Sequence, residues 1–132
     1  MQINSINSTN FKAKIIPSQA LSSALELAQE EAKSGREEGL KLAAKFYNSL
    51  RTIEKDRTAE LFFVDATPVH FYPHMRLGRT TRLLEYFGNT PRDIAYSIIS
   101  GVNKLVEGRY LRDQMADDAK NTDLTKAFLR WA

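Results

Sequence analysis

The stretch ELFFVDATPVHFYPHMRLGRTTR, residues 60–82, decides how the rest of this chain is arranged. It holds the densest aromatic run, both histidines, two of the four prolines and three arginines at three-residue spacing. Leu61–Val64 is a short apolar run and Val69–Tyr72 is extended in type, with the turn residues Asp65–Pro68 between them. We therefore predict an antiparallel β-hairpin that ends at Pro73. A hairpin alone is marginally stable, so helices or another strand must cover one of its faces.

Two amphipathic helical patterns precede the hairpin. The first follows Pro17-Ser18, where the serine hydroxyl can cap free backbone N–H groups, and its apolar stripe runs from Leu21 to Ala32. We expect Gly35 to end or kink this helix. The second pattern covers Arg36–Lys55. Two such helices meeting at a glycine form either a helical hairpin or one long bent helix, and the sequence leaves both open.

Helical patterns also follow the hairpin. A short helix is predicted over residues 80–87, where two leucines and a phenylalanine share one side. The clearest helix start in the chain is Thr90-Pro91, which combines a capping threonine with a proline at the first helical position. The long pattern over residues 91–115 predicts the central core helix. A last short helix begins near the capping residue Asp123 and carries Trp131, which we expect to be docked.

These elements predict a mainly α fold, with four or five helices in a bundle-like or orthogonal arrangement and a small antiparallel β-hairpin. A mixed α+β fold is the alternative. Residues 1–10 are rich in Asn and Ser and are predicted to be a flexible segment, whereas residues 11–132 form one domain. Phe11–Ile15 alternates apolar and basic residues. This segment is either a strand on the domain's own surface or an arm that pairs with a neighbouring subunit or partner.

The composition narrows the class of protein. The chain has 132 residues, of which 42% are hydrophobic and 27% charged, an ordinary globular composition. It has no cysteine, which excludes disulfides, thiol nucleophiles and iron–sulfur clusters. The N-terminal residues do not resemble a secretory signal, and no apolar run approaches the ~18–20 residues that cross a membrane. We therefore predict a cytoplasmic protein with no membrane partner.

The two histidines are candidate site residues. Asp65, His70 and His74 have the spacing D-x4-H-x3-H, which resembles a set of three metal ligands. In an extended strand, however, His70 and His74 lie about 13 Å apart, too far to share one ion. The sequence also contains no phosphate-binding loop, HExxH zinc motif or GxSxG nucleophile elbow. We therefore predict no metal and no cofactor, and assign no catalytic residue.

The arginines form a second candidate site. Arg76, Arg79 and Arg82 share a face if the helix predicted after the hairpin begins early, and Arg92 can join them. Guanidinium groups bind phosphate in bidentate fashion, and the nearby aromatic Tyr72 can stack on a base. The alternative is a solvated arginine face that pairs with the acidic segment Glu26–Glu38. The full set of candidate binding residues is Arg76, Arg79, Arg82, Arg92, His70, His74 and Tyr72.

Three functions remain in order of preference. The first is a small non-enzymatic interaction or assembly protein that binds a protein partner or associates with copies of itself. The second is a binder of nucleic acid or of a phosphate-containing ligand through the arginines, although a net charge of +3 does not by itself indicate nucleic acid. The third is a small enzyme with a site centred on His70 and His74.

Overall fold

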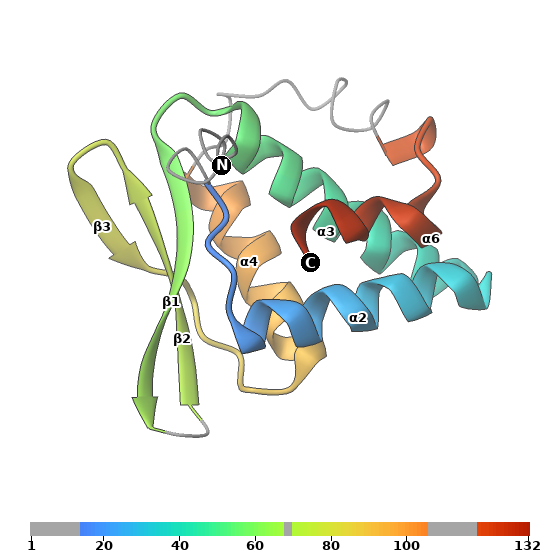
Figure 1. The fold of residues 1–132 in the computed structure, drawn as a ribbon, viewed down its shortest axis with the longest axis horizontal. Helices are drawn as coiled ribbons and strands as arrows, with labels where there is room; N and C mark the ends of the chain where they lie inside the picture. The colour runs from blue at the N-terminus through green and yellow to red at the C-terminus, as the bar shows by residue number, and fades with distance from the viewer. Residues whose placement is uncertain (1–13, 68–69, 106–118) are drawn as a thin grey trace, which may run out of the picture.

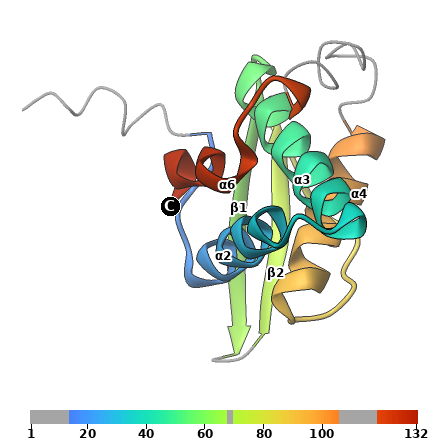
Figure 2. The same ribbon diagram turned by 90° about the vertical axis from the view of Figure 1, so that its right-hand side faces the viewer.

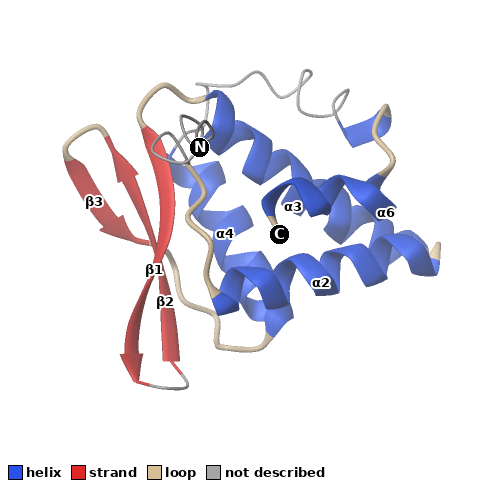
Figure 3. Cartoon of the chain, in the orientation of Figure 1, coloured by secondary structure: helices blue, strands red, loops and turns tan. Residues whose placement is uncertain are grey.

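The computed structural model describes residues 14–67, 70–105 and 119–132, and the side chains of residues 65–67 and 70 are not among those described. Its fold is mixed α+β, the alternative that the sequence offered, and helices make up most of it. An antiparallel three-stranded sheet forms one layer, and helices pack against one of its faces (Figures 1, 2 and 3). The elements are α2 (Gln19–Ser34), α3 (Glu37–Lys55), β1 (Ala59–Thr67), β2 (His70–Leu77), β3 (Thr80–Leu83), α4 (Pro91–Leu105), α6 (Leu124–Ala127) and the 3-10 helix η1 (Phe128–Trp131).

The first two described helices form where the sequence predicted them. The Ser18 hydroxyl accepts a hydrogen bond from the Leu21 N–H at 3.1 Å, which caps α2. Gly35 ends α2 with φ 73°, a left-handed conformation that favours glycine. The chain reverses there and α3 runs back across α2 (Figure 1). Of the two predicted arrangements, the helical hairpin is therefore the one that forms.

Strand β2 continues through Pro73, where we predicted the strand to end. Pro73 pairs with Phe63 of β1, and its carbonyl accepts a hydrogen bond from the Leu84 N–H at 2.8 Å. In an antiparallel ladder the reciprocal bond requires an N–H group at residue 73, which proline lacks. The proline is tolerated because its missing donor faces the point where the pairing with β3 ends, at Leu83.

The predicted helix over residues 80–87 is wrong. Thr80–Leu83 is instead the third strand, joined to β2 by the two-residue turn Gly78-Arg79. Gly78 has φ 63°, and this backbone conformation lets the chain reverse within two residues. Leu77 and Thr80 face each other directly across the turn. The hairpin that we predicted is therefore part of a larger meander of three strands.

The segment before α2 lies along the other edge of β1. The Leu61 N–H donates to the Lys14 carbonyl at 2.7 Å, and the Ile16 N–H donates to the Leu61 carbonyl at 2.9 Å. Ile15 thereby forms a parallel bridge with Leu61, in agreement with a strand-like segment on the domain's own surface. The predicted flexible segment, residues 1–10, and the first three residues of the predicted strand or arm, 11–13, lie outside the described residues.

Helix α4 starts at the predicted cap, where the Asp93 N–H donates to the Thr90 hydroxyl at 3.1 Å. It is described as far as Leu105, and the rest of the predicted helix to residue 115 lies outside the described residues. Trp131 is buried, as predicted, and its indole N–H donates to Glu54 at 2.8 Å. Within the described ranges, no helix is both long enough and apolar enough to span a bilayer.

We predict that a larger residue in place of Gly101 on α4 destabilises the protein, because Leu84 packs directly over this glycine. A Cβ at position 101 would lie 2.5 Å from the Leu84 Cδ2 atom, and Leu84 is itself buried. We expect Gly101→Val to lower the free energy of unfolding by about 1–3 kcal/mol in urea denaturation. The exposed Asn103→Val on the same helix is the matched control and should change it by less than about 0.5 kcal/mol. A Gly101→Val protein as stable as the wild type would contradict this packing.

Candidate functional site

The described helices lie on one side of the sheet, as Figures 1 and 2 show, and none of them covers the opposite face. Strand alternation sends Ala59, Leu61 and Met75 into the core, where all three are buried. The residues between them point away from the helices, and the strand register places their neighbours on β3 beside them. We call this surface the outer face. It consists of Glu60, Phe62, Val64, Tyr72, His74, Arg76, Thr81 and Leu83.

Three side chains at the centre of the outer face are stacked on one another. Phe62 and His74 pair directly across β1 and β2, with ring centroids 5.5 Å apart and planes inclined by 22°. The Arg76 guanidinium lies 5.7 Å from the Phe62 centroid, in cation–π range, and forms an ion pair with Glu60 at 3.3 Å. His74 Nδ1 is 2.9 Å from the Tyr72 carbonyl, so a protonated Nδ1 donates there. These contacts hold the three side chains in defined positions.

A second aromatic pair extends the outer face. Tyr86, from the loop after β3, lies against Tyr72 with ring centroids 4.8 Å apart. Partial burial raises the pKa of Tyr86 above its usual value, and Tyr72 and Asp93 raise it further. The loop is anchored by Leu84 against α4. Sequence reasoning missed Tyr86 because it lay within the helix that we wrongly predicted.

The composition of the outer face is typical of a binding surface. Among its eight residues are two aromatic rings, a histidine and an arginine, with no lysine. Val64 and Leu83 are 43% and 56% exposed, so apolar area is open to solvent as well. Aromatic residues and arginine are enriched in protein interfaces, and lysine is depleted. The arrangement is therefore suited to recognition by stacking and apolar contact.

The four candidate arginines do not form one surface. Arg76 belongs to the outer face, whereas Arg82 pairs with Met75 and so points to the opposite face of the sheet. Arg79 lies in the turn between β2 and β3, and Arg92 lies in the first turn of α4. The helix that would have aligned the first three does not form, because this segment is a strand.

Arg92 is instead held by Glu31 of α2. Its guanidinium lies 2.8 Å from Glu31 Oε2, and Arg36 binds the other carboxylate oxygen at 3.1 Å. For Arg92, pairing with the acidic segment is thus the alternative that forms. The hydrogen bond from Arg92 holds the pKa of Glu31 below its usual value against the opposing effect of burial, and the charges of both arginines lower it further. The carboxylate therefore joins α2, α3 and α4 at their meeting point.

The histidine set is only partly described. His74 lies in the outer face, whereas the side chains of Asp65 and His70 are outside the described residues. In the part of the chain that is described, no group of three His, Cys, Asp or Glu residues is placed to hold a metal ion.

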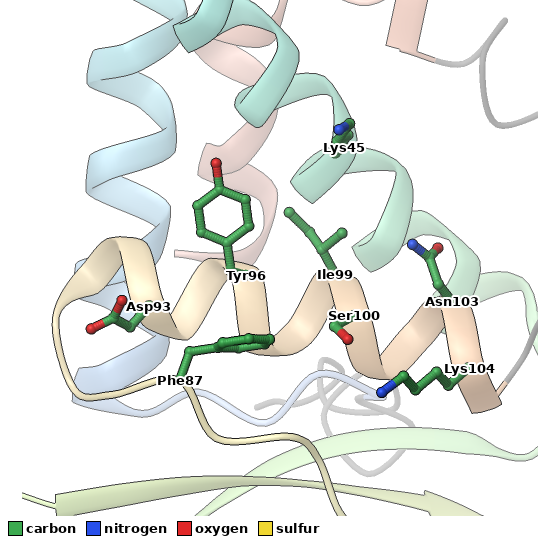
Figure 4. A pocket seen from close by; sticks show the side chains of 8 residues that line it. All are labelled: Lys45, Phe87, Asp93, Tyr96, Ile99, Ser100, Asn103 and Lys104. Atoms are coloured by element: carbon green, nitrogen blue, oxygen red, sulfur yellow. The ribbon is translucent and has the colours of Figure 1, made fainter.

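A separate groove runs along α4 and has a volume of about 620 Å³. Figure 4 shows Tyr96 and Ile99 between Asp93 at one end and Asn103 and Lys104 at the other. Lys104 is bound to Glu85 at 2.7 Å. The volume is in the range of small-molecule sites. Its lining residues are Lys45, Phe87, Asp93, Tyr96, Ile99, Ser100, Asn103 and Lys104. Nothing in the sequence pattern indicated this groove, because it is formed by segments distant along the chain.

The ion pairs of Glu31 predict a pH-dependent contribution to stability. The folded-state pKa of Glu31 is lower than its ordinary value of 4.5, so its contribution is present above pH 4.5 and is lost as pH falls through the folded-state pKa. We expect Glu31→Gln to be less stable than wild type at pH 7 in urea unfolding. The free energies of unfolding of the two proteins should converge below pH 4.5.

The matched control is Glu37→Gln, because Glu37 forms an exposed ion pair with Lys41 at 3.6 Å. The free energy of unfolding of this variant should remain close to that of the wild type at every pH. A stability difference for Glu31→Gln that stays constant from pH 7 to pH 3.5 would show that the lost carboxylate charge is not its cause.

Comparison with known proteins gives no relative from which a function can be carried over. No protein-family model matches the chain, no curated protein matches its sequence, and no solved structure matches its fold. Because a fold alone does not determine a function, the function must be argued from the geometry and chemistry of the surfaces described above.

Proposed function

We propose that this protein is a non-enzymatic interaction module that binds a protein partner through the outer face of its sheet. The observation that carries this proposal is the stack of His74, Phe62 and Arg76 on a face that none of the described helices covers. Side chains already held in position lose little conformational entropy when a partner binds. Such a stack is suited to act as the centre of an interface, surrounded by the apolar Val64 and Leu83.

The charge of the outer face favours protein over nucleic acid. Arg76 and Glu60 form an ion pair, so their charges offset each other, and the remaining residues of the face carry no formal charge when His74 is neutral. Nucleic-acid affinity depends on several cations that contact phosphates together. Arg76, Arg82 and Arg92 lie on three different surfaces, so they do not form such a group.

The surroundings of His74 favour binding over catalysis. Its ring is stacked on Phe62 and its Nδ1 contacts the Tyr72 carbonyl. A general base in nucleophilic catalysis needs a hydroxyl or thiol within hydrogen-bond reach and an acceptor that orients it. In the described part of the chain, His74 has the carbonyl contact but makes no hydrogen bond to a hydroxyl group.

The size of the outer face favours a single segment of the partner. The eight residues of β2 extend about 26 Å, and three strands side by side are roughly 15 Å wide. This footprint is about half of the ~800 Å² that each partner buries in a standard stable interface. A second copy of the chain would therefore need contacts beyond this face to form a stable dimer.

A peptide-display selection tests the proposal. A library of random twelve-residue peptides would be selected against the full chain, and bound peptides mapped by amide chemical shifts. We expect the largest shifts in β1 and β2. We expect Phe62→Thr combined with Arg76→Thr to weaken binding at least tenfold, because the central stack is lost. Threonine keeps a β-forming residue at both positions.

The control is Lys41→Ala, which alters an exposed side chain near the start of α3 and outside the sheet. It should leave the affinity of the selected peptides unchanged. Peptides that map to the α4 groove, or that bind the double variant as tightly as wild type, would contradict the proposed function. A stable dimer in sedimentation that the double variant abolishes would identify a second copy as the partner.

A further inference from the structure

Strand β3 has an open edge. The sheet order is β1-β2-β3, and no described residue pairs with the side of β3 that faces away from β2. All four of its residues are exposed, and Figure 1 shows β3 at the rim of the molecule, away from the helices. The outer edge of β1, by contrast, is partly covered by the backbone around Ile15. An unpaired strand edge can accept an extended segment from another chain.

The hydrogen-bond alternation identifies the backbone groups that are available. The Leu84 N–H donates to the Pro73 carbonyl, so residue 84 faces β2. Residues of an antiparallel strand alternate between facing one neighbour and the other. Residues 80 and 82 therefore face β2 as well, and Thr81 and Leu83 direct their N–H and C=O groups away from the sheet. These groups form a short template for one additional strand.

The two sides of this edge differ in chemistry. Arg82 points to the face that carries the helices, near a cavity of about 350 Å³ lined also by Leu77, Lys104 and Leu105. Arg79 lies in the adjacent turn, and neither arginine forms an ion pair with a described residue. Residues 70–84 contain no acidic residue. The opposite side of the edge presents Leu83, which is 56% exposed and belongs to the outer face.

We propose that the free edge of β3 binds an extended segment of the partner in which acidic residues alternate with apolar residues. This inference rests on the proposed function and specifies how the partner is held. Side chains of an added strand alternate between the two faces of the sheet, so every second residue lies on the side of Arg82. Acidic residues on that side are complementary to the positive charge of Arg82. Apolar residues on the other side contact Leu83 and continue the outer face.

A second copy of β3 is a poor match for this edge. Antiparallel pairing of two β3 strands about a two-fold axis brings Arg82 of each copy close together on one face. Like charges on neighbouring strands destabilise the pairing. The same arginine that attracts an acidic segment therefore disfavours edge-to-edge pairing between copies, which supports a different chain as the occupant.

The test uses an eight-residue peptide in which glutamate alternates with valine, titrated into the full ¹⁵N-labelled chain. We expect the amides of Thr81 and Leu83 to shift and to become protected from hydrogen exchange, because they gain acceptors. A peptide with lysine in place of glutamate should bind at least tenfold more weakly. N-methylation of the peptide at the residues that pair with β3 should abolish binding, because it removes the donors of the added strand.

Charge reversal separates recognition from a purely structural role of Arg82. Arg82→Glu should lower the affinity for the glutamate peptide at least tenfold, and the variant should bind the lysine peptide instead. A variant with a damaged fold would not gain this affinity. Lys41→Glu, on α3, is the matched control and should leave the preference for glutamate unchanged. Equal binding of the two peptides by wild type would overturn the inference.

The outcomes also separate this inference from the proposed function. If peptides from the display selection depend on Phe62 and Arg76 but tolerate both N-methylation and Arg82→Glu, the outer face binds the partner and the edge proposal is wrong. If their binding is unaffected by the Phe62→Thr and Arg76→Thr variant, the proposed function itself fails. Unprotected amides at Thr81 and Leu83 in the presence of bound glutamate peptide overturn the edge proposal alone.

Discussion

The missing N–H group of Pro73 sets the arrangement of the chain around the sheet. Pro73 accepts a hydrogen bond from Leu84 but cannot return one, so the pairing of β2 with β3 stops at this point. The chain then leaves the sheet and Leu84 packs over Gly101 of α4. The loop that follows places Tyr86 against Tyr72 and is held to α4 by the Phe87 N–H, which donates to the Ser97 hydroxyl at 3.2 Å. Pro73 thus determines where the pairing of β3 ends. The chain that leaves the sheet at this point packs on α4 and forms the border of the outer face.

The period of two along the strands separates the residues that form the core from those of the outer face. Leu61 and Met75 are buried beneath the helices, and their neighbours Phe62 and His74 must therefore point outward. The open face then collects aromatic and cationic side chains that stack on one another instead of packing into a core. The proposed binding function follows from this division, because the exposed stack contributes little apolar area to the interior and has no other described element to cover it.

The helices were largely predictable, and the sheet was only partly so. Helix ends depend on local signals, and Ser18, Gly35 and Thr90 each act at the predicted position. The strand at 80–83 was missed because Leu83 and Leu84, together with Phe87, have spacing that also fits a helix, and strand pairing depends on residues distant in sequence. The arginines were misplaced for the same reason. Spacing of three aligns side chains on a helix, but here the chain reverses at Gly78-Arg79, and the register of β2 with β3 places Arg76 and Arg82 on opposite faces of the sheet. The contact between Tyr86 and Tyr72 corresponds to no periodic pattern in the sequence.

The alternation of inner and outer residues also affects how the surface can change over generations. The central outward side chains of β1 and β2 lie between inward ones: His74 lies between the buried Pro73 and Met75, and Phe62 lies between the buried Leu61 and the partly buried Phe63. A substitution at an outward position alters the outer face and leaves the interior side chains in place. The chemistry of this face can therefore change through single replacements, and each intermediate sequence retains the same core. The protein in this sense resembles a display scaffold, in which binding specificity can vary independently of the fold.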